Sequence, residues 1–239
     1  MGQPAAVPGS PGEPGLTEPF VDATRSAGLY FQHINGMPGE FYFSEMVGGG
    51  VALCDYDNDG DLDVYLVQGH LLGPDMEPGD ASFEAGLQGP LTDRLYRNDL
   101  DGGSLGFADV TTASGLDARG YGMGVATADL DGNGWIDIYV ANDLSENRSW
   151  MNQGDGTFRN TGLFNGSALN DAGDFDFDGD GDEDLFVSHL VTQTNTLSVN
   201  DGTGLFEDQS VRTGLGPPSL PFTGFGTAWF DYDNDGWLV

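Results

Sequence analysis

The sequence predicts an all-β fold, a β-propeller built from four-stranded blades. An acidic loop recurs four times, beginning at residues 55, 129, 176 and 231. Apolar and polar residues alternate around the first three loops, as in paired strands. Weaker echoes of two further strands follow, so each unit reads strand, acidic loop, strand, strand, turn, strand. Four-stranded units repeated along a chain are typical of a propeller, and a parallel β-helix or a sandwich is the structural alternative.

The innermost strand comes first in each unit, because a small or Gly-rich apolar run precedes each loop. These runs are GGGVALC (48–54), GMGVATA (122–128), LNDAGDF (169–175) and GFGTAWF (224–230). Glycine suits inner strands, where blades crowd the central channel of a propeller. The second strand follows the loop, as VYLVQ (64–68), IYVAN (138–142) and LFVSH (185–189).

The third and fourth strands are predicted from weaker repeats that are joined by an Asn/Asp/Gly turn. The third strands lie in LYRND (95–99), WMNQGDGTF (150–158) and LSVNDGTGLF (197–206). The fourth strands are expected within 107–116, 158–164 and 206–215. A further outer strand is predicted in FVDATRSAGL (20–29), where it would close the last blade of a complete ring.

The chain divides into a Pro/Gly-rich leader at residues 1–19, predicted to be flexible, and the propeller repeats at 20–239. A Gly/Pro/acid-rich insertion between about residues 69 and 92 indicates a surface excursion. The fourth acidic loop reaches Val239, so we expect three blades and the start of a fourth, and we interpret the chain as a fragment of a longer, seven-bladed propeller. Open blade edges would favour self-association.

The charge of the chain argues against several classes of partner. It has 39 acidic and 7 basic residues, a net charge of -32. Nucleic acids and anionic membranes bind clustered positive charge, so neither is expected as a partner. With 38% hydrophobic and 11% aromatic residues, the chain does not have the composition of a fully disordered acidic protein. Cys54 is the single cysteine, which excludes an intrachain disulfide and a multi-cysteine metal site. The acid is therefore expected to bind cations.

The acidic loops follow the pattern Asp-x-Asp-x-(Asp/Asn)-Gly-x-x-Asp. Calcium takes about six to eight oxygen ligands from carboxylates, carbonyls and water. Positions 1, 3 and 5 of a tight loop point inward, glycine at position 6 permits the bend, and positions 7 and 9 offer a carbonyl and a carboxylate. The predicted ligands of three complete Ca²⁺ sites are Asp55, Asp57, Asp59, Asp61 and Asp63; Asp129, Asp131, Asn133, Trp135 (by its carbonyl) and Asp137; and Asp176, Asp178, Asp180, Asp182 and Asp184.

A fourth, incomplete site is predicted at Asp231, Asp233 and Asp235, where Val239 occupies position 9. Mg²⁺ is less favoured because it demands octahedral geometry and retains water, and Zn²⁺ because Cys and His are lacking at these spacings. The loops are not EF-hands, since that motif needs Glu at position 12 and an exiting helix. Position 12 is Leu66, Val140 and Val187.

The chain resembles the FG-GAP/VCBS repeat proteins, whose calcium loops lie in blade hairpins as in integrin α propellers. Within that group it is similar to the cartilage acidic protein (ASPIC/UnbV) branch. The segments that carry this resemblance are GGGVALCDYDNDGDLDVYLVQG (48–69), LTDRLYRNDL (91–100), FADVTTASGL (107–116) and GYGMGVATADLDGNGWIDIYVAN (120–142). The resemblance covers about residues 20–239 and implies a calcium-stabilised interaction or adhesion module.

These observations predict an exported calcium-binding protein rather than an enzyme. Extracellular-type sites have dissociation constants of about 10⁻⁴–10⁻³ M, so they fill where calcium is millimolar, as in an extracellular or periplasmic setting. A protein or glycan ligand is expected, with the insertion at 69–92 as the leading contact patch. We expect no catalytic residues, no organic cofactor and no membrane insertion. The alternative is a calcium-dependent polysaccharide lyase or hydrolase on a propeller scaffold.

Overall fold

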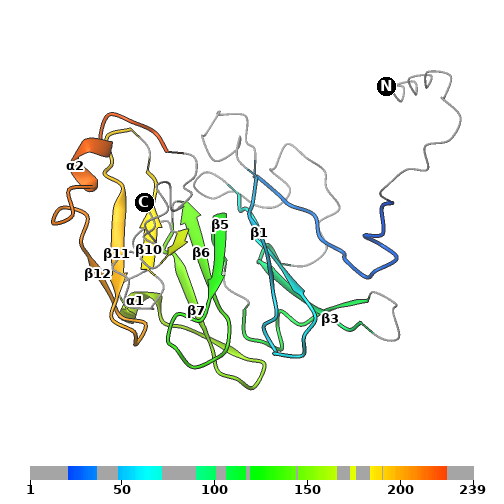
Figure 1. Ribbon diagram of the computed structural model, residues 1–239. Helices are drawn as coiled ribbons and strands as arrows, with labels where there is room; N and C mark the ends of the chain where they lie inside the picture. Colours follow the sequence, from blue (N-terminus) through cyan, green and yellow to red (C-terminus); the bar gives the residue numbers. More distant parts are fainter. Residues whose placement is uncertain are drawn as a thin grey trace, which may run out of the picture.

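Three antiparallel sheets of four strands each make up the part of the chain that the computed structural model describes (Figure 1). That part comprises residues 21–36, 48–71, 90–100, 106–116, 119–143, 145–165, 173–175, 184–189 and 191–224. The helices described are two of four residues each, α1 (Gly162–Asn165) and α2 (Gly216–Ser219). The prediction of an all-β fold is therefore confirmed.

Each sheet is a meander in which consecutive strands are hydrogen-bonded neighbours, so the predicted order of strands within the repeat is confirmed. The first sheet holds β1 (Val51–Cys54), β2 (Asp63–Leu66), β3 (Arg94–Asn98) and β4 (Phe107–Asp109). The second holds β5 (Tyr121–Ala128), β6 (Asp137–Asp143), β7 (Arg148–Asn152) and β8 (Phe158–Asn160). The third holds β9 (Gly173–Phe175), β10 (Asp184–Val187), β11 (Thr196–Asn200) and β12 (Phe206–Asp208).

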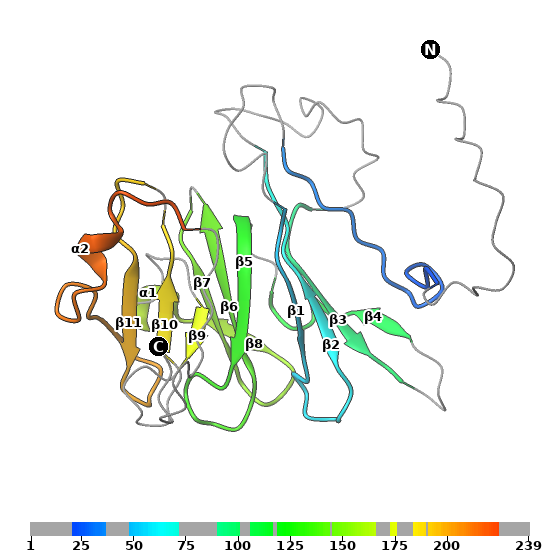
Figure 2. The ribbon, with the colours of Figure 1, turned by 45° about the horizontal axis from the view of Figure 1, so that its top comes forward.

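The first hairpin of each sheet has the same register. The residue before the acidic loop pairs with the aspartate at position 9 of that loop, as Cys54↔Asp63, Ala128↔Asp137 and Phe175↔Asp184. The first two acidic loops consequently lie at the same end of their sheets, along the lower edge in Figure 2. A one-residue slip would turn every side chain to the opposite face of the sheet, so a shared register also gives the sheets equivalent faces.

The sheets stand side by side with their first strands adjacent, since β1 contacts β5 and β5 contacts β9 (Figure 2). This arrangement is consistent with a β-propeller-like fold, in which the first strand of each blade lies nearest the axis.

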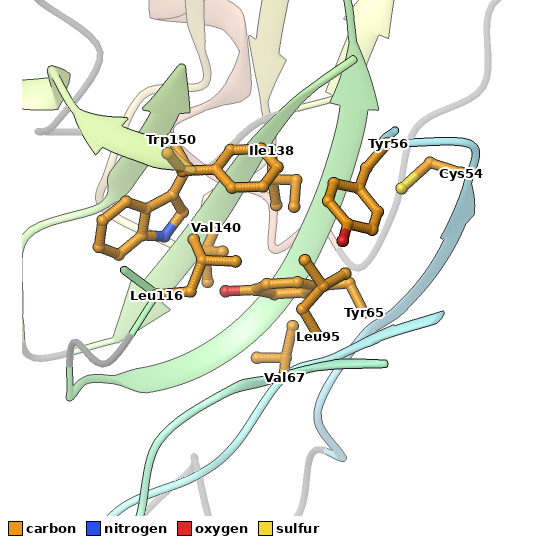
Figure 3. Close-up of a cluster of buried hydrophobic side chains, with 10 residues drawn as sticks. Cys54, Tyr56, Tyr65, Val67, Leu95, Leu116, Ile138, Val140 and Trp150 are labelled. Atoms are coloured by element: carbon orange, nitrogen blue, oxygen red, sulfur yellow. The ribbon is translucent and has the colours of Figure 1, made fainter. Parts of the chain in front are cut away.

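An apolar core fills the space between the first and second sheets (Figure 3). Tyr65 and Leu95 from the first sheet and Ile138 and Val140 from the second are fully buried in it. Burying such side chains stabilises a fold by about 1.5–3 kcal/mol each, so the contact between neighbouring sheets is a main source of stability.

The outer strand predicted at 20–29 is wrong for the residues that the structure describes there. Residues 24–28 form turns, and no strand is present in 21–36. The turn lies against the start of β4, where the N–H of Phe107 donates to the carbonyl of Ala27 at 2.7 Å. One sheet further on, Phe158 N–H donates to Ser114 O at 2.9 Å in the same way. The described part of the chain offers the segment no antiparallel partner with which to form a strand.

Close approach of neighbouring inner strands explains the glycines that precede the acidic loops. A Cβ atom at Gly122 in β5 would lie 2.0 Å from Cγ1 of Val67, which follows β2 in the first sheet. At Gly50, just before β1, a Cβ atom would lie 3.0 Å from the backbone nitrogen of Val125. The prediction that these runs suit crowded inner strands is confirmed at both positions.

We expect the Gly122→Ala variant to be less stable by about 1–3 kcal/mol, the usual cost of overpacking. Urea unfolding followed by circular dichroism measures the change. Gly48→Ala is the matched control, because a Cβ atom there would meet no atom of the described residues within 4 Å. Equal losses in the two variants would contradict the close contact between sheets. Shortening Val67 to alanine in the Gly122→Ala background should restore part of the stability.

Candidate metal centre

The first acidic loop brings Asp55, Asp57 and Asp59 together. One carboxylate oxygen from each lies within 4.8 Å of the others, and we call these three residues the first-loop triad. Two ligands on opposite sides of a cation, each at about 2.4 Å, are about 4.8 Å apart, so the three oxygens are close enough to coordinate one divalent ion.

Backbone groups hold the first-loop triad in place. Asp55 accepts the N–H groups of Asp59, at 3.1 Å, and Gly60, at 3.0 Å, which closes the loop onto its first residue. This path requires left-handed backbone at Asn58 (φ 58°) and Gly60 (φ 94°), a region that glycine and asparagine tolerate best. The glycine predicted to permit the bend therefore does so.

The second acidic loop also brings three carboxylates together, at positions 1, 3 and 9 of the loop: Asp129, Asp131 and Asp137. Their carboxylate oxygens lie within 4.8 Å of one another, and we call them the second-loop triad. Asp129 accepts N–H groups from Asn133 at 3.0 Å and Gly134 at 2.7 Å, as Asp55 does in the first loop.

The two remaining predicted ligands of the second loop are engaged with each other. The N–H of Trp135 donates to Oδ1 of Asn133 at 2.8 Å, while Nδ2 of Asn133 donates to the carbonyl of Asn152 at 3.2 Å. In the first loop Asp61 lies outside the triad and its N–H donates to Asp59 at 2.9 Å.

The aspartate at position 9 has a structural role in each hairpin that the sequence did not indicate. Asp63 is fully buried, and its two oxygens accept the N–H groups of Tyr56 at 3.0 Å and Asn98 at 2.7 Å. Asp137 likewise accepts Leu130 N–H at 2.9 Å and Asn152 N–H at 2.7 Å. One carboxylate thus joins its own loop to the third strand of the same sheet. Asp63 does not join the first-loop triad, whereas Asp137 belongs to the second.

The third loop is described only at Asp184, which is fully buried and accepts Asn200 N–H at 2.7 Å. Asp184 therefore lies in β10 as Asp63 and Asp137 lie in β2 and β6. The other predicted ligands, Asp176, Asp178, Asp180, Asp182, Asp231, Asp233 and Asp235, lie outside the described residues.

An asparagine at the end of each third strand was missed as a site residue. Asn98, Asn152 and Asn200 are buried, and each donates its backbone N–H to the position-9 aspartate of its sheet. The sequence carried a signal for them, because the same residue recurs in LYRND, WMNQGD and LSVNDG. This recurrence indicated only a turn, however, and gave no reason to connect the asparagine with the acidic loop.

Electrostatics in the first loop favours a bound cation. Oδ1 of Asp57 is buried and has no hydrogen-bond partner among the described residues. Burial, followed by the charges of Asp59 and Asp55, raises the pKa of Asp57 above its ordinary value. A buried, unpaired carboxylate oxygen among like charges is costly, and a divalent cation would offset both terms. The metal ligands that the triad offers are carboxylate oxygens. Ca²⁺ binds oxygen ligands, whereas Zn²⁺ is usually bound by Cys and His.

Cys54 lies at the end of β1, beside this site. Burial and then the charges of Asp63 and Asp55 raise the pKa of its thiol to about 12. Cys54 is therefore a small buried residue rather than a reactive thiol. Within the described ranges, no helix has the length and apolar character needed to cross a membrane.

Comparison with known protein families gives one match. Residues 176–238 match the family described as FG-GAP-like repeat. That segment contains the third and fourth acidic loops, so the chain carries the FG-GAP-like repeat that its acidic loops resemble, and the first and second sheets repeat the same pattern of strands and loop. No curated protein matches the chain.

We expect the position-9 aspartate to stabilise the fold whether or not metal is present. In Asp63→Asn one of two acceptor oxygens becomes an amide that faces a backbone donor, at a cost of about 1–3 kcal/mol. Urea unfolding in the presence of a chelator measures this loss. Asp59→Asn is the control, because Asp59 is exposed, its Oδ1 acceptor is retained and one repelling charge is removed, so its stability in chelator should not fall. If the Asp63→Asn variant has the same stability as the wild type in chelator, the role assigned to this carboxylate is wrong.

The metal-free protein should lose stability as pH rises from about 4 to about 7. Burial raises the pKa of Asp63 and Asp93 from 3.8 to about 6 and that of Asp137 to about 7. The folded chain therefore binds more protons than the unfolded chain in this window, and stability falls with increasing pH. Urea unfolding in chelator at several pH values measures the slope, which Asp93→Asn should reduce. Rising stability over the same range would show the assignment to be wrong.

Proposed function

We propose that this protein is a calcium-binding β-propeller module of the FG-GAP/VCBS type, exported from the cell, in which calcium has a structural role. The single observation that carries this proposal is the pair of carboxylate triads in equivalent hairpins, each with oxygens close enough to coordinate one divalent ion. In this function Asp55, Asp57 and Asp59 hold one ion and Asp129, Asp131 and Asp137 a second, while the loops at 176–184 and 231–235 hold further ions.

The position of the loops explains how an ion would stabilise the fold. Tyr56, within the first loop, packs on Phe158 of the second sheet with ring centroids 5.9 Å apart. In the second loop Asp131 lies beside Gly204 of the third sheet, where a Cβ atom would be 3.4 Å from the aspartate side chain. Each described loop therefore contacts the next sheet. An ion that orders the loop would also order the interface between blades.

The proposal of an exported module rests on the chemistry of the sites. Exposed loops with several carboxylates are suited to millimolar calcium, which extracellular and periplasmic fluids provide. A rigid propeller would then present a protein or glycan ligand with the loops of one face. The insertion at 69–92 is the proposed contact patch, and its residues 72–89 lie outside the described ranges. The FG-GAP-like repeat matched at residues 176–238 supports this interaction role.

Calcium should raise the melting temperature of the protein, and a chelator should reverse the change. A site held at 100 times its dissociation constant contributes about 2.7 kcal/mol, so two filled sites would add several kcal/mol. Differential scanning calorimetry with millimolar calcium, millimolar magnesium and chelator measures the effect. Magnesium at the same concentration should have little effect, because it retains its octahedral water shell.

The control for this experiment is Asp57→Asn with Asp131→Asn, which removes one charge from each triad with little change of shape. The calcium-dependent shift should be largely lost in this variant, while its stability in chelator is retained. A wild-type melting temperature that is the same in calcium and chelator would refute the structural role of the ion.

A further inference from the structure

One buried side chain connects the first and second acidic loops. Nδ2 of Asn152 donates to the carbonyl of Tyr56 in the first loop at 2.8 Å and to that of Ile136 in the second loop at 3.1 Å. The backbone N–H of Asn152 also donates to Asp137, a member of the second-loop triad, and its carbonyl accepts from Asn133. Asn152 is 1% exposed, so water cannot easily replace these partners.

The next pair of sheets repeats this connection. Nδ2 of Asn200, in β11, donates at 3.0 Å to the carbonyl of Leu130, which occupies in the second loop the position of Tyr56 in the first. The backbone N–H of Asn200 donates to Asp184 at 2.7 Å. Two consecutive interfaces therefore use the same residue type at the same strand position for the same pair of contacts. This repetition makes the connection a property of the repeat.

A second contact joins the two loops directly. Nδ2 of Asn58, at position 4 of the first loop, donates to the carbonyl of Gly134 at 3.1 Å. Gly134 belongs to the second loop, and its N–H donates to Asp129 of the second-loop triad. Position 4 of the second loop is Gly132, so the loops differ in the side chain that makes this contact.

We propose that neighbouring calcium loops are energetically coupled, so that an ion in the first loop strengthens calcium binding in the second, with Asn58 and Asn152 as the coupling residues. This inference rests on the proposed function, since it concerns the regulation of the same sites. Asn58 and Asn152 are positioning residues, because they act on the loops and not on the ion.

The physical basis is shared ordering. An ion bound to Asp55, Asp57 and Asp59 restricts the loop that contains Tyr56 and Asn58, and these residues in turn hold Asn152 and Gly134. The second loop is then already partly ordered, so the second ion pays a smaller entropy cost when it binds. This gives positive coupling without a change of structure. Filling the first loop also reduces the negative charge near the second, which opposes the effect. That term is screened by salt, whereas buried hydrogen bonds are not.

The experiment follows calcium titrations of ¹⁵N-labelled protein by amide NMR, in which Gly60 reports the first loop and Gly134 the second. The first loop is inactivated by Asp57→Asn with Asp59→Asn. We expect the calcium midpoint at Gly134 to rise by about fivefold or more, the lower end of typical coupling between sites. Titrations at about 0.15 M and 0.5 M KCl separate the contribution of the two lost charges, because long-range charge effects shrink with salt.

The coupling residues are tested in the same way. Asn58→Gly removes the side chain and preserves the left-handed backbone, which a glycine already adopts at position 4 of the second loop (Gly132, φ 67°). In the Asn58→Gly background, inactivating the first loop should raise the calcium midpoint at Gly134 by about half as much or less. In the Asn152→Ala background, the midpoint at Gly134 should not change when the first loop is inactivated. If Asn152→Ala does not fold, the result for Asn58→Gly still tests whether these side chains carry the coupling. Gln153→Ala removes an exposed amide that donates to the carbonyl of Met151, so it is the matched control and should retain full coupling.

Two results would overturn the inference. If the calcium midpoint at Gly134 is the same whether or not the first loop is inactivated, the two sites bind calcium independently. The proposed function would not be affected by this result. A coupling that is equal in wild type, Asn58→Gly and Asn152→Ala would exclude these residues as its carriers. If neither Gly60 nor Gly134 responds to millimolar calcium, the proposed function itself fails.

Discussion

The fold depends on a buried carboxylate that accepts two backbone N–H groups in the first hairpin of each of the first two sheets. Asp63 and Asp137 each join position 2 of their loop to the third strand of the same sheet, and neither side chain is exposed to solvent. Burying a carboxylate is unfavourable unless its lone pairs are satisfied, so such a residue strongly favours the one register in which both donors are present. The common register of the three hairpins and the placement of the acidic loops at one end follow from this constraint.

Concentrated negative charge is tolerated in this chain because it is divided between two roles. Asp63 accepts only backbone donors inside its sheet, whereas Asp55, Asp57 and Asp59 gather where water or a cation can reach them, and Asp137 takes part in both arrangements. Asp57 lies between these two environments, with one oxygen that is buried and unpaired. The net charge of -32 is in part the result of repeating the acidic loop along the chain, and the proposed calcium ions would make its crowded carboxylates favourable.

Stability and metal binding are expected to be inseparable in this protein. The acidic loops contact the following sheet through Tyr56 and Phe158, and through Asn152 and its equivalent Asn200, so the loop that would hold an ion is also part of the interface between blades. In repeat proteins each unit contacts only its neighbours, and the interfaces carry much of the stability. An ion in one loop would therefore stabilise two neighbouring sheets, as the proposed structural role of calcium requires.

The sequence alone determined the repeat, the all-β class, the four strands of each unit and the glycine that bends each loop, because these depend on local periodicity and backbone freedom. It also identified Asp55, Asp57 and Asp59 as neighbours, since residues in one tight turn are necessarily close together. Tertiary structure alone decided the second role of Asp63 and the role of Asn152, because both depend on donors and acceptors that come from another strand or another sheet. The prediction of a strand at 20–29 was wrong for the same reason. A strand needs a partner, and whether one is present is a property of the assembled sheets that no local pattern encodes.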